Sequence, residues 1–141
     1  MPIRTVIHLN FQGHARAALT FYQNIFNGQQ TLVTYANAGR GEEAVDPDQI
    51  LWGQVTGEDG IALMACDVPA GADWHPGDNA FFVSLRGDDV NMVRTLWSGL
   101  EQGAIVLHAL TPSQWSPLYG MLHDRFGVVW VVDVSVPHSV A

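Results

Sequence analysis

The clearest structural pattern in the chain is IHLNFQG at residues 7–13, followed directly by HARAALTFYQNIFNG at residues 14–28. In the first part apolar and polar residues alternate, which is the two-residue period of a strand with one buried face. In the second part apolar residues return every three or four positions, which is the period of an amphipathic helix. The Asn-Gly pair at its end suits the left-handed backbone that follows a helix. The stretch therefore predicts a strand over 3–11 and a helix over 14–26.

The rest of the chain repeats this order of elements. Apolar runs bounded by Gly, Pro, Asn and Asp predict strands, and a second amphipathic stripe after Asp88 and Asp89 predicts a helix with an acidic N-cap. The run over 60–66 is apolar throughout, which predicts a strand buried on both faces. In chain order we expect strands over 29–35, 49–56 and 60–66, then a strand over 80–85, a helix over 88–102, and strands over 104–110, 117–123 and 128–134.

Residues 3–66 and residues 80–134 therefore have the same strand-helix-strand-strand-strand order, and a linker rich in Pro, Gly and Asp joins them over 67–79. The helix of each segment covers one face of its sheet, so the other face has to be covered by something else. We expect one domain over 1–141 of the α+β class, built from two tandem βαβββ modules that form a cupped mixed sheet.

The composition excludes one large class of partner. The formal net charge is −8, with six Lys and Arg among 141 residues. These basic residues do not cluster, and nucleic-acid binding needs a basic surface, so we expect no nucleic-acid partner. Charged residues make up 14% of the chain and hydrophobic ones 48%. Much of the surface is therefore apolar or neutral, which leaves room for a subunit interface, and we expect a homodimer.

The N-terminus and the lengths of the apolar runs predict the cellular location of the protein. The opening residues MPIRTVIH lack the apolar core of a secretory signal, and no apolar run reaches the roughly 18 residues of a membrane span. We therefore expect a cytoplasmic protein with no membrane partner.

Cys66 is the one cysteine, which excludes an intrachain disulfide and a Cys-rich zinc site. It lies in an apolar run and is predicted to be a small buried hydrophobe.

Three stretches carry a resemblance to a known family: the opening strand and helix, LMACDVP at residues 63–69, and WSPLYG at 115–120 with DRFGVVW at 124–130. Together they resemble the vicinal oxygen chelate superfamily of glyoxalases, bleomycin-resistance proteins and extradiol dioxygenases. The third stretch is similar to its PhnB-like branch. Some family names label this branch 3-demethylubiquinone 3-methyltransferase, but the sequence has no Gly-rich loop of the kind that holds a nucleotide cofactor.

The resemblance implies where a metal would lie. Enzymes of this superfamily hold a divalent metal in the cup, with His, Glu or Gln ligands from the first and last strands of each module. In this chain those positions fall near Val6, near residues 80–81, at residues 64–66 and at Val131, and nearly all are apolar. Only His8 lies close enough to be a ligand, and three or four ligands are the norm. We expect no resident cofactor, with a divalent metal held around His8 as the alternative.

The strand alternation indicates which side chains line a cavity for a small-molecule ligand. Polar residues on the face opposite the helix, together with aromatic residues, are typical of such a pocket. The candidates are His8, Asn10, Trp52, Gln54, Arg86, Trp115, Tyr119 and Trp130. A structural role stays open for each of them: His8 as a satisfied polar group, Trp130 as a core residue, and Trp115, in a loop of Pro and Ser, as an interface residue.

Three functions remain open. The chain is a metal-independent small-molecule-binding protein, for which the acidic composition favours a cationic ligand. Alternatively it is a metal-dependent lyase, isomerase or dioxygenase with ligands centred on His8. In the third interpretation it is a non-catalytic interaction protein whose cup is filled by a neighbouring subunit. A homodimer is expected in each case.

Overall fold

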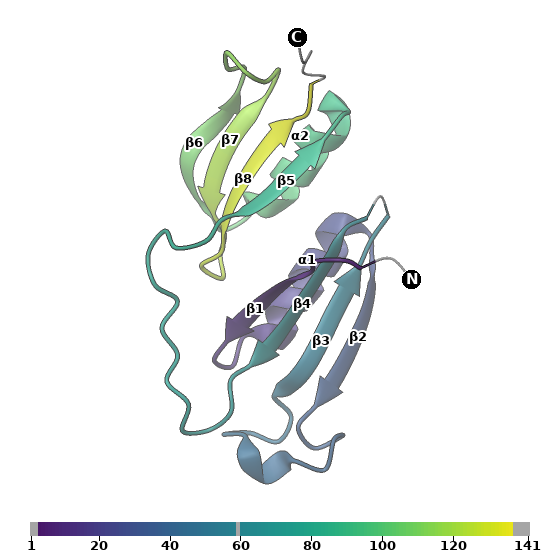
Figure 1. Ribbon diagram of the computed structural model, residues 1–141, viewed down its shortest axis with the longest axis vertical. Coiled ribbons are helices and arrows are strands. Elements are labelled where there is room, and N and C mark those ends of the chain that lie inside the picture. Colours follow the sequence, from purple (N-terminus) through teal and green to yellow (C-terminus); the bar gives the residue numbers. More distant parts are fainter. Residues whose placement is uncertain (1–2, 59, 137–141) are drawn as a thin grey trace. The chain divides into compact units, whose positions relative to one another are not determined.

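The computed structural model describes residues 3–58 and 60–136. The chain forms two compact units, Met1–Pro76 and Gly77–Ala141, and their boundary lies inside the linker predicted over 67–79. Each unit holds one α-helix and one four-stranded mixed sheet with the same strand order (Figure 1). The predicted α+β class with two tandem βαβββ modules is confirmed. That residues 1–141 form a single domain stays a prediction.

The first module contains β1 (Ile7–Phe11), α1 (Ala15–Phe26), β2 (Gln29–Thr34), a short 3-10 turn η1 (Gly41–Glu43), β3 (Ile50–Thr56) and β4 (Ala62–Asp67). Its strands are ordered β1-β4-β3-β2; β1 and β4 run parallel, and the other neighbours are antiparallel. The helix lies across one face of this sheet (Figure 1). It ends at Asn27, whose φ of 50° is left-handed as the Asn-Gly pair predicts.

The core of the first module lies between α1 and the sheet. The buried helix residues are Ala15, Ala18, Leu19, Tyr22 and Phe26. Gly53 of β3 lies beneath Leu19, and a Cβ at Gly53 would clash with that side chain. The glycine therefore allows the helix to approach the sheet closely.

Asp67, the last residue of β4, links three segments of the first module by hydrogen bonds. Its side chain is buried and accepts hydrogen bonds from the backbone N–H groups of Gly13 (2.8 Å), Ala15 (3.0 Å) and Ile50 (3.0 Å). The first N–H groups of a helix have no partner inside the helix, and His14 at the N-cap supplies no side-chain bond. Asp67 thus satisfies the start of α1 and the start of β3 at once.

The second module contains β5 (Val83–Gly87), α2 (Val90–Leu100), β6 (Ile105–Thr111), β7 (Tyr119–His123) and β8 (Val129–Val134), with the strands ordered β5-β8-β7-β6. Of the two candidates Asp88 and Asp89, Asp89 is the N-cap of α2, and its side chain accepts from the N–H groups of Asn91 (2.8 Å) and Met92 (3.1 Å). Gly120 of β7 lies beneath Trp97 of α2, and a Cβ there would meet the indole ring. Both modules therefore place a glycine under a large helix side chain.

The structure corrects several boundaries that the sequence predicts. The first strand of each module begins later than predicted, at Ile7 and at Val83, because ladder pairing with the last strand begins there. β5 also continues to Gly87. The predicted burial of β4 on both faces is wrong: alternate residues are buried against α1, whereas Met64 and Cys66 on the other face are half-buried. Within the described residues, no helix has the length and apolar character needed to cross a bilayer.

Candidate functional site

The first open face is the side of the first sheet that α1 does not cover, and it consists of His8, Asn10, Trp52, Gln54, Met64 and Cys66. The strand register builds this face in rows. His8 pairs with Met64, and Met64 pairs with Gln54. Asn10 pairs with Cys66 in the next row, and Trp52 lies two residues from Gln54 on the same strand. The sequence thus correctly predicts that His8, Asn10, Trp52 and Gln54 share one face.

The first open face is polar but carries no charged side chain. The Cys66 thiol donates to Oδ1 of Asn10 at 3.4 Å. Burial, and secondarily the negative charge of Asp67, raises the pKa of Cys66, so the thiol stays protonated at neutral pH and is a poor nucleophile. His8 is exposed, and its ring has no hydrogen-bond partner among residues 3–58 and 60–136. This face offers hydrogen-bonding groups to a ligand but no activated nucleophile.

The second open face is the corresponding side of the second sheet, and it consists of Ser84, Arg86, His108, Tyr119, Met121, His123, Val131 and Asp133. One row runs from Arg86 to Asp133 to Tyr119. Arg86 donates to both carboxylate oxygens of Asp133, from Nε at 3.1 Å and from Nη2 at 3.0 Å. The hydrogen bonds to Asp133 raise the pKa of the Arg86 guanidinium further above its usual value. The Arg86 side chain is 61% exposed and that of Asp133 11%, so the arginine lies over the carboxylate.

Three rings form an aromatic cluster on this face: Trp115, Tyr119 and His108. The ring centroids of Trp115 and Tyr119 are 5.1 Å apart, and those of Tyr119 and His108 are 4.9 Å apart, both edge-to-face. Nδ1 of His108 lies 2.8 Å from the carbonyl oxygen of Ala109. Because a carbonyl only accepts, Nδ1 carries the proton, and Nε2 of the neutral ring remains an acceptor.

Trp115 is 56% exposed, yet its loop is well fixed. Oγ of Ser113 accepts from the N–H groups of Trp115 (3.3 Å) and Ser116 (3.1 Å). The buried hydroxyl of Ser116 donates to the carbonyl oxygen of Val134 (2.7 Å) and accepts from its N–H (3.1 Å). These bonds hold the loop to the end of β8, so Trp115 is held in place before any ligand arrives.

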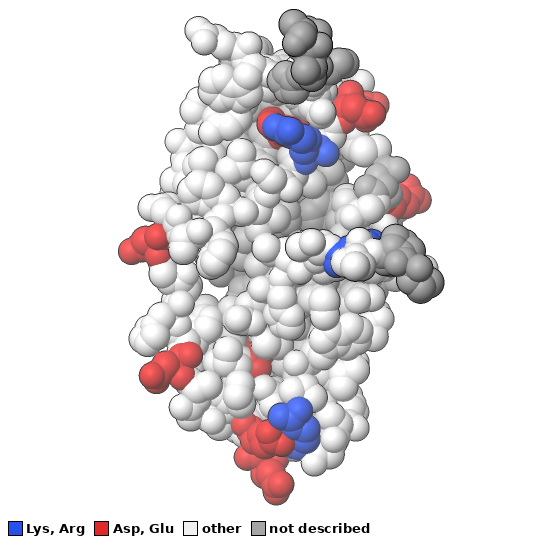
Figure 2. Space-filling view, in the orientation of Figure 1, with Lys and Arg blue, Asp and Glu red and all other residues white. Residues whose placement is uncertain are grey.

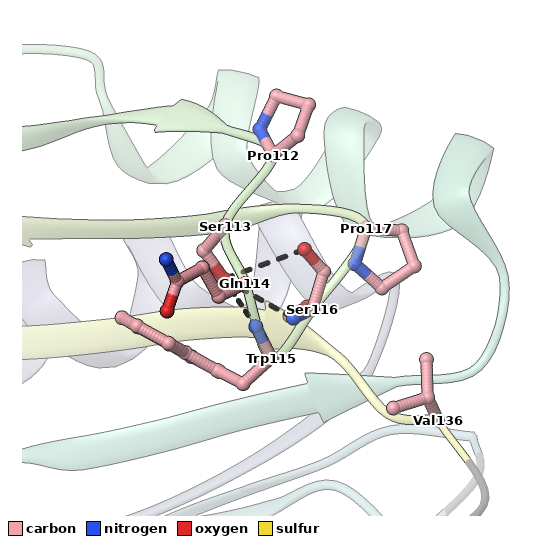
Figure 3. Close-up of a pocket in the computed structure, with 7 residues that line it drawn as sticks. All are labelled: Pro112, Ser113, Gln114, Trp115, Ser116, Pro117 and Val136. Carbon is pink, nitrogen blue, oxygen red and sulfur yellow. Dashed lines mark hydrogen bonds between the residues drawn. The ribbon is translucent and has the colours of Figure 1, made fainter.

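Beside Trp115 the same loop forms an open depression of about 270 Å³ (Figure 3). It is lined by Pro112, Ser113, Gln114, Trp115, Ser116, Pro117 and Val136. Ligand pockets commonly span about 300–1,000 Å³. The depression is thus large enough for a small fragment of a ligand, and its wall is the exposed indole.

The structure does not bring Trp130 together with the other candidates. Trp130 is 1% exposed and lies on the helix-facing side of β8, where it pairs with Val83 and Leu122. Its indole N–H donates to Oδ2 of Asp124 at 2.9 Å. The alternation along β8 already indicates this, because Trp130 has the opposite parity to Val131. Trp130 is a core residue in the second module.

Sequence reasoning missed His108 and Asp133. His108 is the one polar side chain between Ile105 and Leu110, and this isolation in an apolar run was the available signal. Asp133 lies 47 residues from Arg86, and nothing in the local sequence joins the two. Their pairing depends on the parallel register of β5 and β8.

The residues at the positions that the superfamily uses for metal ligands do not fit a divalent metal. Val6 and residues 80–81, where two of the ligands were expected, lie before β1 and β5. The nearest ladder positions that correspond between the modules are His8 with Met64 and Ser84 with Val131, which hold an imidazole, a thioether, a hydroxyl and an aliphatic chain. Iron, manganese, nickel and zinc sites need several His or carboxylate ligands. Across the described ranges, 3–58 and 60–136, no three His, Cys, Asp or Glu side chains are grouped to hold a metal.

The fold, with two βαβββ modules, is shared by a domain from Frankia sp. EAN1pec that is described as a glyoxylase/bleomycin resistance protein/dioxygenase domain. That structure is 8% identical, with 96% of this chain and 99% of the other covered and a TM-score of 0.66. By sequence, this chain belongs to the family whose model is described as 3-demethylubiquinone-9 3-methyltransferase, and the match covers residues 4–133.

Two further solved structures share this fold. A protein from Pseudomonas aeruginosa is 28% identical, with 95% of this chain and 98% of that chain covered and a TM-score of 0.82. A PhnB protein from Bacillus cereus, described as a putative 3-demethylubiquinone-9 3-methyltransferase, is 22% identical, with coverage of 94% and 100% and a TM-score of 0.71. No curated protein matches the chain.

Proposed function

We propose that this protein binds a small molecule on its open faces and works without a resident metal. One observation carries the proposal: Trp115 is exposed, fixed by its loop, and packed edge-on against Tyr119. A large aromatic side chain left in water on a rigid loop is typical of a binding surface. The indole N–H has no partner among the described residues and is available to a ligand.

The proposal includes no metal because the side chains at the relevant positions are poor metal ligands. The four positions described above offer one imidazole and no carboxylate, which is too few strong ligands for a divalent ion. Methyl transfer is also not proposed. The connection between β1 and α1, residues 12–14, contains a single glycine and is too short to wrap a nucleotide cofactor.

Ligand screening by thermal shift tests the binding function. The untagged full chain is mixed with a broad library of cationic, anionic and neutral aromatic compounds. A ligand at about 100 times its Kd adds roughly 2.7 kcal/mol to the free energy of unfolding, so a true ligand raises the Tm by several degrees. Trp115→Ala is expected to abolish the shift. Met92→Ala, which truncates an exposed apolar side chain on α2, is the matched control and keeps it.

Elemental analysis tests the metal-free part. We expect no stoichiometric Fe, Mn, Ni or Zn in protein purified without chelator, before and after reconstitution. A stoichiometric metal that is lost in His8→Ala would overturn the proposal and favour the metal-dependent lyase, isomerase or dioxygenase. The homodimer remains part of the proposal, and sedimentation at micromolar concentration measures it. A monomer there would also contradict the interpretation that a neighbouring subunit fills the cup.

A further inference from the structure

The Arg86 guanidinium is bound along one edge and open along the other. On the bound edge, the N–H of Nε and one N–H of Nη2 donate hydrogen bonds to Asp133. The opposite edge, formed by Nη1 and the outer N–H of Nη2, has no partner in the part of the chain that the structure describes. Two parallel N–H groups on one edge of a guanidinium are the geometry that binds a carboxylate through both oxygens. Asp133 fixes the plane of the Arg86 guanidinium, and the arginine side chain as a whole is 61% exposed.

The acidic net charge of the protein does not govern this site. Among the strand residues that make up the two open faces, Arg86 and Asp133 are the only residues that carry a fixed charge, and they pair with each other. Other acidic residues lie off these faces, for example Glu42, Glu43, Asp46 and Asp48 in the loop before β3, and Asp88, Asp89 and Glu101 next to α2. Figure 2 shows scattered charges on an otherwise uncharged face of the molecule. Beyond the Debye length of about 8 Å the distant carboxylates are screened, whereas Arg86 would touch the ligand.

Tyr119, the central ring of the aromatic cluster, lies in the same row as Arg86. Arg86, Asp133 and Tyr119 occupy neighbouring strands, so Arg86 and Tyr119 are separated by about 10 Å, two strand spacings. Trp115 extends the aromatic surface beyond Tyr119. A flat ring system placed on these aromatic residues would reach Arg86 with a carboxylate attached to its edge.

We infer that the ligand of the second open face is a planar aromatic carboxylate, bound through its oxygens to Arg86 and through its rings to Tyr119 and Trp115. The inference rests on the proposed binding function and names the chemical class of its ligand. It replaces the cationic ligand that the overall composition favours.

Isothermal titration calorimetry with three matched probes tests it on the full chain. 2-Naphthoate, 2-naphthamide and 2-(aminomethyl)naphthalene have the same rings and carry a negative, a neutral and a positive group. We expect 2-naphthoate to bind at least about 10-fold more tightly than either of the others, since charge-assisted bidentate bonds are the strong ones. Trp115→Ala should weaken all three probes.

Variants of Arg86 measure how much its charge contributes to the affinity, separately from the aromatic contacts of the ligand. Arg86→Gln alone leaves the Asp133 carboxylate buried without its partner, so the main variant is Arg86→Gln combined with Asp133→Asn, which keeps a hydrogen-bonded pair. We expect it to lower the affinity for 2-naphthoate about 10-fold, to that of 2-naphthamide, and to leave the amide unaffected. Arg86→Lys keeps the charge but loses the two-point geometry, and an intermediate loss is expected. Arg94→Gln, at an exposed arginine of α2, makes the same charge change as Arg86→Gln alone and should alter nothing.

The outcomes distinguish the ligand class from the function. Equal binding of 2-naphthoate and 2-naphthamide, tighter binding of the amine, no binding of 2-naphthoate, or a preference that survives in the double variant would each overturn the inference. Neutral or cationic compounds that bind in a Trp115-dependent manner would support the binding function and contradict the carboxylate ligand. If the broad library also yields no ligand, the proposed function falls as well.

Discussion

The carboxylate of Asp67 accepts the backbone N–H of Ala15 at 3.0 Å, which joins the end of β4 to the first turn of α1. Asp67 also binds Gly13 and Ile50. Asp67→Ala leaves these three N–H groups without their acceptor, and each buried unsatisfied group costs about 1–3 kcal/mol. We expect a loss of at least about 2 kcal/mol in urea denaturation.

Asp73→Asn is the control for this change, because Asp73 is exposed in the linker. It should keep the denaturation midpoint of the unsubstituted protein. An Asp67→Ala variant with the same midpoint would show that water replaces the carboxylate without cost.

The glycine beneath Trp97 has a measurable role. Gly120→Ala introduces a methyl group that meets the indole ring of a buried side chain, and overpacking of this kind costs about 1–3 kcal/mol. Thermal and urea denaturation give the difference. Gly120→Ala with Trp97→Phe should cost less than the sum of the two single changes, because the smaller ring makes room for the methyl group. Strictly additive effects would mean that the two side chains do not meet.

Trp130 is buried and Trp115 is exposed, so the same substitution should have effects of different size at the two positions. Trp130→Phe reduces a fully buried side chain and leaves Oδ2 of Asp124 without its indole donor, so we expect a loss of about 1–3 kcal/mol. Trp115→Phe alters an exposed loop residue and should stay within about 0.5 kcal/mol. Urea titration of both variants measures this, and similar losses for the two would contradict the assignment of Trp130 to the core.

Cys66 should be slow to react at neutral pH. Burial raises the pKa of its thiol, so we expect alkylation by iodoacetamide to be slower in the folded protein than in urea and to accelerate only above the pH at which a free thiol ionises. The sign for stability follows: the folded state holds the proton more tightly, so the contribution is complete below the unfolded pKa and is lost as the pH rises through the folded one. Equal pH profiles for folded and unfolded protein would contradict this.

The alternation of the strands made the module order and the first open face predictable. His8 and Asn10 are separated by one apolar residue, and Trp52 and Gln54 by a glycine, so the period of two places each pair on one side of its strand. The same rule separates Trp130 from Val131, although the aromatic content of the sequence drew Trp130 into the candidate set.

The remaining features depend on partners that are distant in the chain. The starts of β1 and β5 are set by where their ladders with β4 and β8 begin, which no local pattern encodes. Asp67 follows an apolar run, and its three backbone donors come from two other segments. The pair of Arg86 and Asp133 likewise needs the register of two strands.

The repeated topology allows the two modules to be compared position by position. On the face that the helix covers, both modules have a glycine under a bulky helix residue: Gly53 under Leu19 and Gly120 under Trp97. On the open side Arg86 and Asp133 stand where the first module has Asn10 and Cys66. A doubled chain can thus hold one side of its sheets constant for folding while the other side of each copy diverges separately, so recognition can change without a new scaffold.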